Sequence, residues 1–306
     1  PVGATFLRNN LNKRSLAIDL KQPEGVDLVL RLAPRFDVFG ENFRAGTAAR
    51  LGIGYEAVRA THPAVVYLSI SGFGQDPASP YREMGAYAAI VEGMSGIYEY
   101  KRAPGRPPAA NPVGALGDIS SALFGAVGVL AALRHRDHTG VGQHIDVAML
   151  DATVAMTDIV ANFHSLGVER EWGSGIGIVE TFAASDGHFV LQCVREHHFA
   201  TLCTEIGCPE LADDERFATR AGWQDHLDDV LRPAIESWAS DRPLTEVVGI
   251  LSGAGMACGP SQTSAQVVTD PHLAVRNMLV ETLPSDEGNP VPVSYTHLTL
   301  PTSDLV

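Results

Sequence analysis

Residues 65–71 read VVYLSIS, a stretch rich in β-branched and aromatic side chains. Such a stretch favours a strand that is buried on both faces, as strands of parallel sheets are. Upstream, 15–19 (SLAID) and 36–39 (FDVF) predict two short strands, and PEGVDLVLRLAPR, which begins at Pro23, predicts a helix between them. Short helices are expected at 47–51 and 55–61. This alternation of strands and helices predicts an α/β layer with a mostly parallel sheet.

The alternation resumes after a loop at 101–117 that is rich in Pro, Gly and Ala. A helix is expected from Asp118 to about Arg136, and 144–150 (HIDVAML) predicts a strand. Asp151 then opens a second helix, DATVAMTDIVANFHSL. An aspartate at a helix start is ordinarily a cap. Asp151 has a second interpretation, because ligand chemistry in α/β sheets gathers where strands lead into helices, and a helix N-terminus favours an ionised carboxylate.

A change in composition after residue 166 predicts a domain boundary. We expect a large domain at 1–166, a glycine-rich linker or loop at 167–179, and a smaller α+β domain at 180–270. In the smaller domain, DGH (186–188) predicts a hairpin turn before the strand FVLQCV. Helices are expected near 197–206, 225–239 and 244–253.

Composition excludes several classes of function. The chain has 306 residues, is 45% hydrophobic and carries a net charge of −14. An acidic chain is a poor ligand for polyanions, and we find no apolar run close to the ~20 residues of a membrane span, so neither nucleic acid nor membrane is an expected partner. The four cysteines form no CxxC pair, which disfavours a metal site and favours a reducing, cytoplasmic compartment.

Both ends of the sequence are unusual. The chain begins with Pro1, and 293–302 read VSYTHLTLPT, which resembles the translation of a sequencing adaptor. We therefore expect a fragment whose residues 293–306 are a non-native tail; the alternative is a genuine Thr-rich strand.

Basic residues next to the predicted strands are candidates for binding a phosphate. Arg44 and Arg50 follow Asn42 in and after ENFRAG, and Lys21 follows the strand at 15–19. Two arginines just past a strand can clamp a phosphate, although solvated surface charge is an equally ordinary role. GFG (72–74) and GVG (140–142) lack the rest of a dinucleotide fingerprint and are interpreted as turns.

Several segments, in order, resemble the class III CoA-transferases, a family that includes formyl-CoA and carnitine CoA-transferases. The matching segments of the large domain are NNLNKRSLAIDLKQPEG (9–25), DVFGENFRAG (37–46), LGIGYEAV (51–58), YLSISGFGQ (67–75), MSG (94–96), GD (117–118) and TGVGQHIDVAMLDA (139–152). SDGHFV (185–190), ERFAT (215–219) and TDPHLAVRNML (269–279) continue the match. Each motif is modest, but the ordered set is specific.

The resemblance implies a fold and a set of site residues. The fold is a Rossmann-like large domain with a smaller α+β domain, 271–292 returns toward the large domain, and two subunits interlock as linked rings. The implied nucleophile is Asp151, in VAMLDA. The implied contacts with coenzyme A are Ile18, Lys21, Asn42, Phe43, Arg44 and Arg50, and the implied active-site loop is Gly173, Ser174 and Gly175.

The chemistry implied is transfer of CoA from an acyl-CoA to a small carboxylic acid. The aspartate attacks the thioester to give a mixed anhydride, and the CoA thiolate then forms an aspartyl-CoA thioester that an acceptor carboxylate opens. Coenzyme A is a substrate here; no permanently bound cofactor and no metal are implied.

Two other functions stay open. The α-methylacyl-CoA racemases of the same superfamily use a His and an Asp as acid and base, and this sequence has Tyr87 and Ala88 at the matching His-Asp pair. A phenol replaces an imidazole poorly near neutral pH, which favours the transferase, whereas Ala88 departs from both groups. A non-catalytic CoA-binding relic is the second alternative. An acyl-CoA exchange assay and an α-proton exchange assay would separate the three functions.

Overall fold

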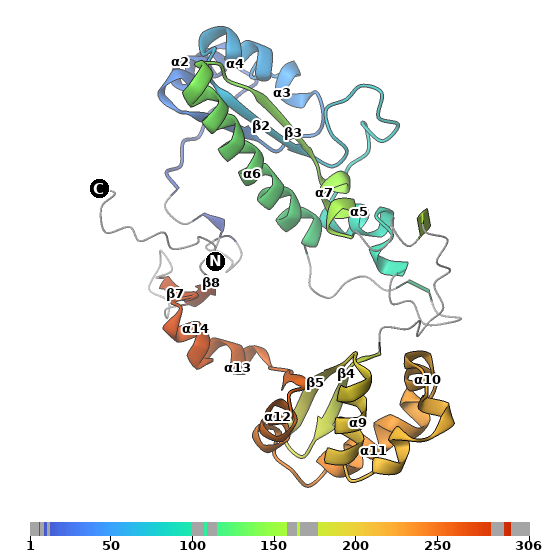
Figure 1. The fold of residues 1–306 in the computed structure, drawn as a ribbon. Coiled ribbons are helices and arrows are strands. Elements are labelled where there is room, and N and C mark those ends of the chain that lie inside the picture. The colour runs from blue at the N-terminus through green and yellow to red at the C-terminus, as the bar shows by residue number, and fades with distance from the viewer. Residues whose placement is uncertain are drawn as a thin grey trace. The chain divides into compact units, whose positions relative to one another are not determined.

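The structure, a computed structural model, describes residues 6, 9–10, 13–99, 107–108, 115–157, 164–165, 177–282 and 291–294. The chain divides into two compact units, one formed by Leu16–Trp172 and one by Pro1–Ser15 with Gly173–Val306 (Figure 1). The division after Trp172 falls within the predicted linker at 167–179. We call them the first and the second unit and describe each by itself.

A three-stranded parallel sheet is the centre of the first unit. Its strands are β1 (Val38–Glu41), β2 (Val66–Ser71) and β3 (His144–Ala148), in the order β1-β2-β3. Val38 pairs with Val66, and Tyr67 pairs with His144. The central strand β2 is the apolar stretch from which the sequence predicts a strand covered on both faces, and each of its residues is buried or half-buried. The parallel α/β layer is therefore confirmed.

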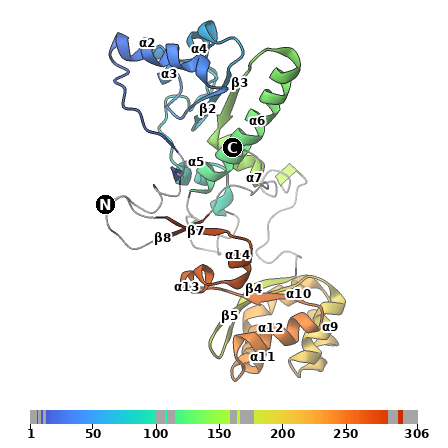
Figure 2. The ribbon, with the colours of Figure 1, turned by 90° about the vertical axis from the view of Figure 1, so that its left-hand side faces the viewer.

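Helices cover both faces of this sheet (Figure 2). On one face, Tyr67 of β2 packs with Val58 of α4 (Tyr55–Thr61), with Leu30 of α2 (Pro23–Leu32), and with Ala33 of the 3-10 turn Ala33–Arg35. The Tyr67 hydroxyl donates a 2.9 Å hydrogen bond to the carbonyl of Ile53. The short helix α3 (Thr47–Arg50) precedes α4.

The opposite face carries the long helix α6 (Leu116–Thr139), which packs on β2 and β3. A β-carbon added to Gly125 of α6 would lie 3.5 Å from the side chain of Leu68, so small residues let this helix approach the sheet closely. Because Tyr67 and Leu68 are neighbours in a strand, they point to opposite faces, which is why both faces of β2 are covered. Two shorter helices, α5 (Ala88–Met94) and α7 (Met149–Met156), pack on α6, and a 3-10 turn spans Ile97–Glu99.

Two expectations for the first unit need correction. Residues 15–19 are not a strand, because no strand among the described residues pairs with them. The helix after β3 begins at Met149 and not at Asp151, so Asp151 lies in its first turn and does not cap it.

Helix α6 is longer and more apolar than expected, because from the sequence we found no apolar run close to the length of a membrane span. Its 24 residues make it the one helix of the described residues that is long and apolar enough to span a membrane by these two criteria alone. In the first unit, this helix packs against β2, β3, α5 and α7. Its apolar residues therefore fit a helix that covers a sheet, because such a helix also needs an apolar side.

The second unit is built on an antiparallel sheet of β4 (Ile178–Ala184), β5 (Gly187–Cys193) and β6 (Ala257–Pro260). Ala184 pairs with Gly187, which confirms the hairpin at DGH. The sheet is accompanied by α9 (Glu196–Glu205), α10 (Arg220–Asp225), a π-helical turn (Leu227–Leu231), α11 (Arg232–Ala239) and α12 (Leu244–Gly253). Shorter 3-10 turns span Pro209–Ala212 and Glu215–Phe217.

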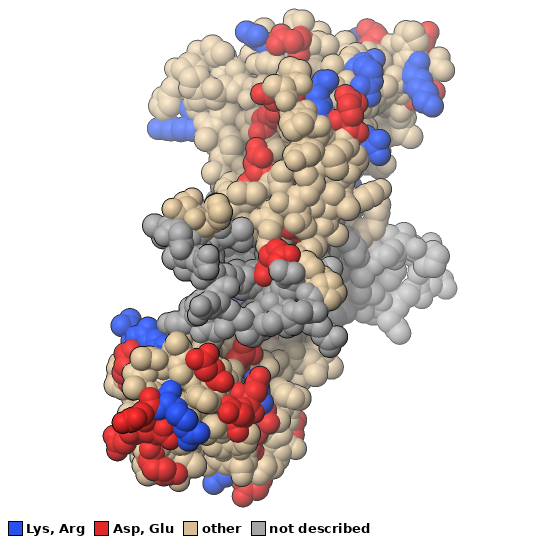
Figure 3. Space-filling model, turned by 90° about the vertical axis from the view of Figure 1, so that its right-hand side faces the viewer, with Lys and Arg blue, Asp and Glu red and all other residues tan. Residues whose placement is uncertain are grey.

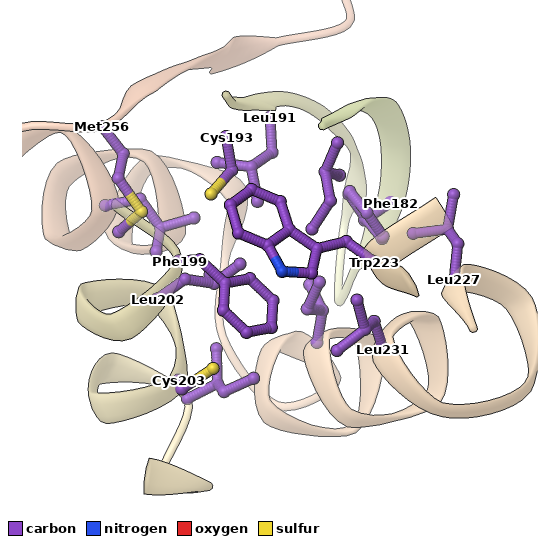
Figure 4. Close-up of a cluster of buried hydrophobic side chains, with 14 of the residues drawn as sticks. Phe182, Leu191, Cys193, Phe199, Leu202, Cys203, Trp223, Leu227, Leu231 and Met256 are labelled. Carbon is purple, nitrogen blue, oxygen red and sulfur yellow. The ribbon is translucent and has the colours of Figure 1, made fainter. Parts of the chain in front are cut away.

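An aromatic core joins this sheet to its helices (Figure 4). The rings of Phe199 and Trp223 stack with centroids 4.4 Å apart, and Phe182 and Leu191 are fully buried beside them. The Trp223 indole N–H donates a 2.7 Å hydrogen bond to the carbonyl of Phe217, so its polar atom is satisfied inside the core. On the face shown in Figure 3, acidic side chains gather over this unit, in the lower part of the picture.

Short elements follow the second sheet. They are α13 (Ser264–Val268), α14 (Pro271–Val275), β7 (Leu279–Thr282) and β8 (Val291–Ser294), and β7 and β8 pair as an antiparallel ribbon. Of the tail expected at 293–306, only residues 293 and 294 are described.

Candidate functional site

A cavity of about 280 Å³ lies where the three parallel strands of the first unit end. Its walls come from the segment after β1, the segment after β2, the loop before α5, the first turn of α6 and the start of α7. The lining residues are Asn42, Phe43, Arg44, Ala45, Ser71, Gly72, Phe73, Arg82, Met84, Gly85, Ala86, Tyr87, Asp118 and Met149. The carboxyl ends of parallel strands are the usual ligand side of an open α/β sheet, so this cavity is the candidate site.

Four residues predicted from the sequence line this cavity: Asn42, Phe43, Arg44 and Tyr87. Asn42 is held by its side-chain amide, which donates a 2.8 Å hydrogen bond to the carbonyl of Ile70. The backbone N–H of Phe43 donates to the Glu41 carboxylate at 2.8 Å. These two hydrogen bonds hold the segment after β1 to the last residue of β1 and to β2.

Three other predicted contacts do not line the cavity. Arg50 lies at the end of α3, where its guanidinium donates a 2.8 Å hydrogen bond to the Thr47 hydroxyl. Ile18 and Lys21 lie in the segment before α2, and the backbone N–H of Lys21 donates to the Asp19 carboxylate. The predicted loop Gly173, Ser174 and Gly175 lies outside the described residues.

The two candidate aspartates differ in their positions. Asp118 lies in the first turn of α6 and lines the cavity. Asp151 lies in the first turn of α7, is exposed, and is not part of the lining, although Met149 of the same helix is. The cavity lining thus includes Asp118 and reaches the first turn of α7, which carries Asp151, through Met149.

A buried acid next to Asp118 changes its titration. Glu92 of α5 is only 2% exposed, and its carboxylate accepts hydrogen bonds from the Tyr98 hydroxyl at 2.9 Å and from the Gly117 backbone N–H at 3.2 Å. Partial desolvation, and secondly the charge of Glu92, raise the pKa of Asp118 above its usual value. Sequence reasoning missed Glu92, because nothing in the order of residues shows that α5 and α6 bring it beside Asp118.

The cavity also contains polar groups that the sequence did not single out. The Ser71 hydroxyl and Nε of Arg82 are buried and have no hydrogen-bond partner among the described residues. Ser71 belongs to the predicted strand, and Arg82 lies in a loop whose sequence, PYREMGAY, carries no recognisable motif.

Among the described residues, no group of three or more His, Cys, Asp or Glu side chains could hold a metal ion. Two of the cysteines, Cys193 and Cys203, are buried thiols of low reactivity. Burial raises the pKa of Cys193 and of Cys203 to about 12, and both thiols lie in the core of the second unit.

Comparison with known proteins gives one consistent result. The profile of CoA-transferase family III matches residues 2–303. The chain is 34% identical over 301 residues to the acetyl-CoA:oxalate CoA-transferase of Acetobacter aceti, covering 93% of this chain and 74% of that one. It is 33% identical over 286 residues to the succinyl-CoA–D-citramalate CoA-transferase of Chloroflexus aurantiacus, covering 90% and 69%.

Solved structures give the same result. A CAIB/BAIF family protein from Brucella suis has a TM-score of 0.80 and 32% identity to this chain, covering 96% of this chain and 76% of that one. Rv3272 of Mycobacterium tuberculosis has a TM-score of 0.78 and 28% identity, covering 94% and 77%.

Proposed function

Because this chain belongs to CoA-transferase family III, whose curated members act on acyl-CoA and carboxylate substrates, we propose that it moves CoA from an acyl-CoA thioester to a small carboxylic acid through a covalent aspartyl intermediate. One observation carries the proposal: at the carboxyl ends of three parallel strands, the cavity joins the Asn42–Arg44 segment to the first turn of α7, which carries Asp151.

The steps follow from the reactivity of a carboxylate. One carboxylate oxygen attacks the thioester carbonyl, the C–S bond breaks, and CoA leaves as a thiolate with the electron pair. The product is a mixed anhydride between the aspartate and the acyl group. The thiolate then attacks the aspartyl carbonyl, which forms an aspartyl-CoA thioester and releases the first acid as a carboxylate. An acceptor carboxylate reverses the sequence, so bonds and charges balance without water or an oxidant.

We propose Asp151, the residue that the resemblance implies, as the nucleophile, with Asp118 as the alternative drawn from the cavity lining. Asp151 lies exposed in the first turn of α7, and Met149 of the same turn lines the cavity. An attacking atom must be held within about 0.5 Å of its productive position, and a helical backbone provides such a fixed support. Asp118 lines the cavity itself, in the first turn of α6.

The two aspartates give a matched pair of variants. We expect Asp151→Asn to lower the rate of CoA transfer by at least ~10³-fold, because the amide keeps size and reach but is not a nucleophile. Asp118→Asn should lower the rate much less. Hydroxylamine added during turnover should convert Asp151 to a hydroxamate, detected by mass spectrometry of its peptide.

The reverse pattern would move the assignment to Asp118. Retention of activity by both variants would overturn the aspartyl mechanism at these positions. Suitable assays start from acetyl-CoA or succinyl-CoA with oxalate or citramalate as acceptors, because the relatives are named for these substrates.

We also propose that the chain acts as a homodimer. Support comes from a stripe of exposed apolar residues, spaced three or four apart along α6: Ile119, Leu123, Val127 and Leu130. Contiguous apolar surface of this kind marks interaction sites in soluble proteins.

A further inference from the structure

Arg82 lies near Arg50 and lines the cavity with Arg44, and the family resemblance implies that these two arginines contact CoA. A β-carbon added to Gly46 would lie 3.0 Å from Nη2 of Arg82 and 3.6 Å from Nη1 of Arg50, so both guanidinium groups border the same glycine. A β-carbon added to Gly85 would lie 2.9 Å from Nη2 of Arg44. Gly46 thus leaves room for the guanidinium groups of Arg82 and Arg50, and Gly85 leaves room for that of Arg44.

Little acidic charge neutralises this cluster. Arg82 has one ion pair among the described residues, a 3.7 Å contact with the Glu83 carboxylate, whose side chain is 85% exposed. Such an exposed pair contributes little. Within residues 13–99 and 115–157, neither Arg44 nor Arg50 forms an ion pair with an acid. In a chain with a net charge of −14, this local positive charge is unusual.

The cluster opens into the candidate cavity. Arg44 and Arg82 both line it, and Nε of Arg82 is a buried donor without an acceptor. The Ser71 hydroxyl in the same lining is also without a partner, and Ser71 is only 4% exposed. Buried polar groups ordinarily have hydrogen-bond partners, so two unsatisfied groups in the lining of one cavity indicate a polar ligand.

We propose that Arg82 is a phosphate-binding arginine of this site and binds a phosphate group of the CoA moiety together with Arg44, with Arg50 beside Arg82 outside the lining; this rests on the proposed CoA-transferase function. Two guanidinium groups in one lining, with a third beside them, exceed the charge of a monocarboxylate and match that of a phosphate dianion or a diphosphate. The acceptor carboxylate is therefore the less suitable ligand for this cluster. Arg82 binds substrate and takes no part in the reacting bonds.

The test measures binding, so that it does not depend on turnover. Titration calorimetry of CoA into the unsubstituted chain is compared with Arg82→Gln and with Arg35→Gln, a control on an exposed arginine outside the cavity. We expect Arg82→Gln to weaken CoA binding by about tenfold or more, and Arg35→Gln to leave it unchanged. Arg82→Lys keeps the charge but loses the planar fork, so it should restore only part of the affinity.

A second ligand, 3′-dephospho-CoA, shows which phosphate group of CoA binds to Arg82. If Arg82 binds the 3′-phosphate, the Arg82→Gln and unsubstituted chains should bind 3′-dephospho-CoA equally; if it binds the diphosphate, the loss persists with that ligand. In turnover, the variant should raise KM for acyl-CoA and leave kcat and KM for the acceptor acid unchanged.

Equal CoA affinity of Arg82→Gln and the unsubstituted chain would overturn the assignment, and so would a rise confined to KM for the acceptor acid. If the unsubstituted chain fails to bind CoA at all, the proposed function itself falls, which a failure of Arg82 alone would not cause. Circular dichroism of each variant separates loss of binding from loss of fold.

Discussion

At the scale of single residues, the site is controlled by two acids with different surroundings. Glu92 is buried and held by two hydrogen bonds, whereas Asp118 faces the cavity. Because Glu92 is fixed, its charge acts on Asp118 from a constant position. A raised pKa makes a carboxylate a stronger base and, when ionised, a better nucleophile, at the cost of a smaller ionised fraction at low pH.

We predict that Glu92→Gln lowers the pKa of Asp118. The amide removes a like charge, so the pKa of Asp118 should fall, although desolvation, the larger cause of its rise, remains. The single amide oxygen of Gln can accept from the Gly117 N–H while its NH2 group donates to the Tyr98 hydroxyl, so the fold should survive. The measurement is a carbon-13 NMR titration of the Asp118 carboxyl in both chains. An unchanged titration would show that Glu92 does not act on Asp118.

The same shift makes a prediction about stability. A carboxyl whose pKa is raised on folding binds more protons in the folded state, so stability is lost as pH rises from the unfolded to the folded pKa. Asp118→Asn removes this loss. We expect urea unfolding to show the variant gaining stability, relative to the unsubstituted chain, at pH 7 compared with pH 4. A relative loss at pH 7 would mean that the folded state favours the ionised form.

At the scale of elements, the close approach of β2 and β3 depends on a glycine. A β-carbon on Gly142, in the turn before β3, would overlap the carbonyl oxygen of Val65, just before β2. We predict that Gly142→Ala destabilises the chain by about 2 kcal/mol or more, because backbone cannot move aside as a side chain can. Gly249→Ala in α12, where no atom lies within 4 Å of the added carbon, should be neutral or stabilising. Denaturant unfolding compares the two; equal effects would contradict the steric argument.

Sequence patterns predicted elements better than they predicted the site. The strand at 66–71 and the hairpin of the second unit follow from local side-chain patterns, which the chain carries within a few residues. The strand expected at 15–19 failed because a strand needs a partner, and pairing is not local. Arg82 and Glu92 were missed for the same reason: their roles come from Gly46 and Asp118, which are distant in sequence.

At the scale of the whole molecule, the exposed side of α6 is the main feature that a single chain does not explain. Leu123 and Val127 are 58% and 65% exposed, although the other side of this helix packs on the sheet. Burying such residues against a second copy would remove apolar surface from water, at about 25 cal/mol per Å². A helix apolar on both sides suits an element that lies between the sheet of one subunit and the surface of another.

We therefore predict that replacing both Leu123 and Val127 with Glu prevents dimerisation. Two charges placed in an apolar interface would each lose hydration without gaining a partner, which outweighs the contacts that remain. Sedimentation velocity should show a dimer for the unsubstituted chain and a monomer for the double variant. Val275→Glu is the matched control, because Val275 is 83% exposed on α14, in the second unit, and should tolerate the charge. A monomeric unsubstituted chain would refute the homodimer, whereas a double variant that stays dimeric would place the interface away from α6.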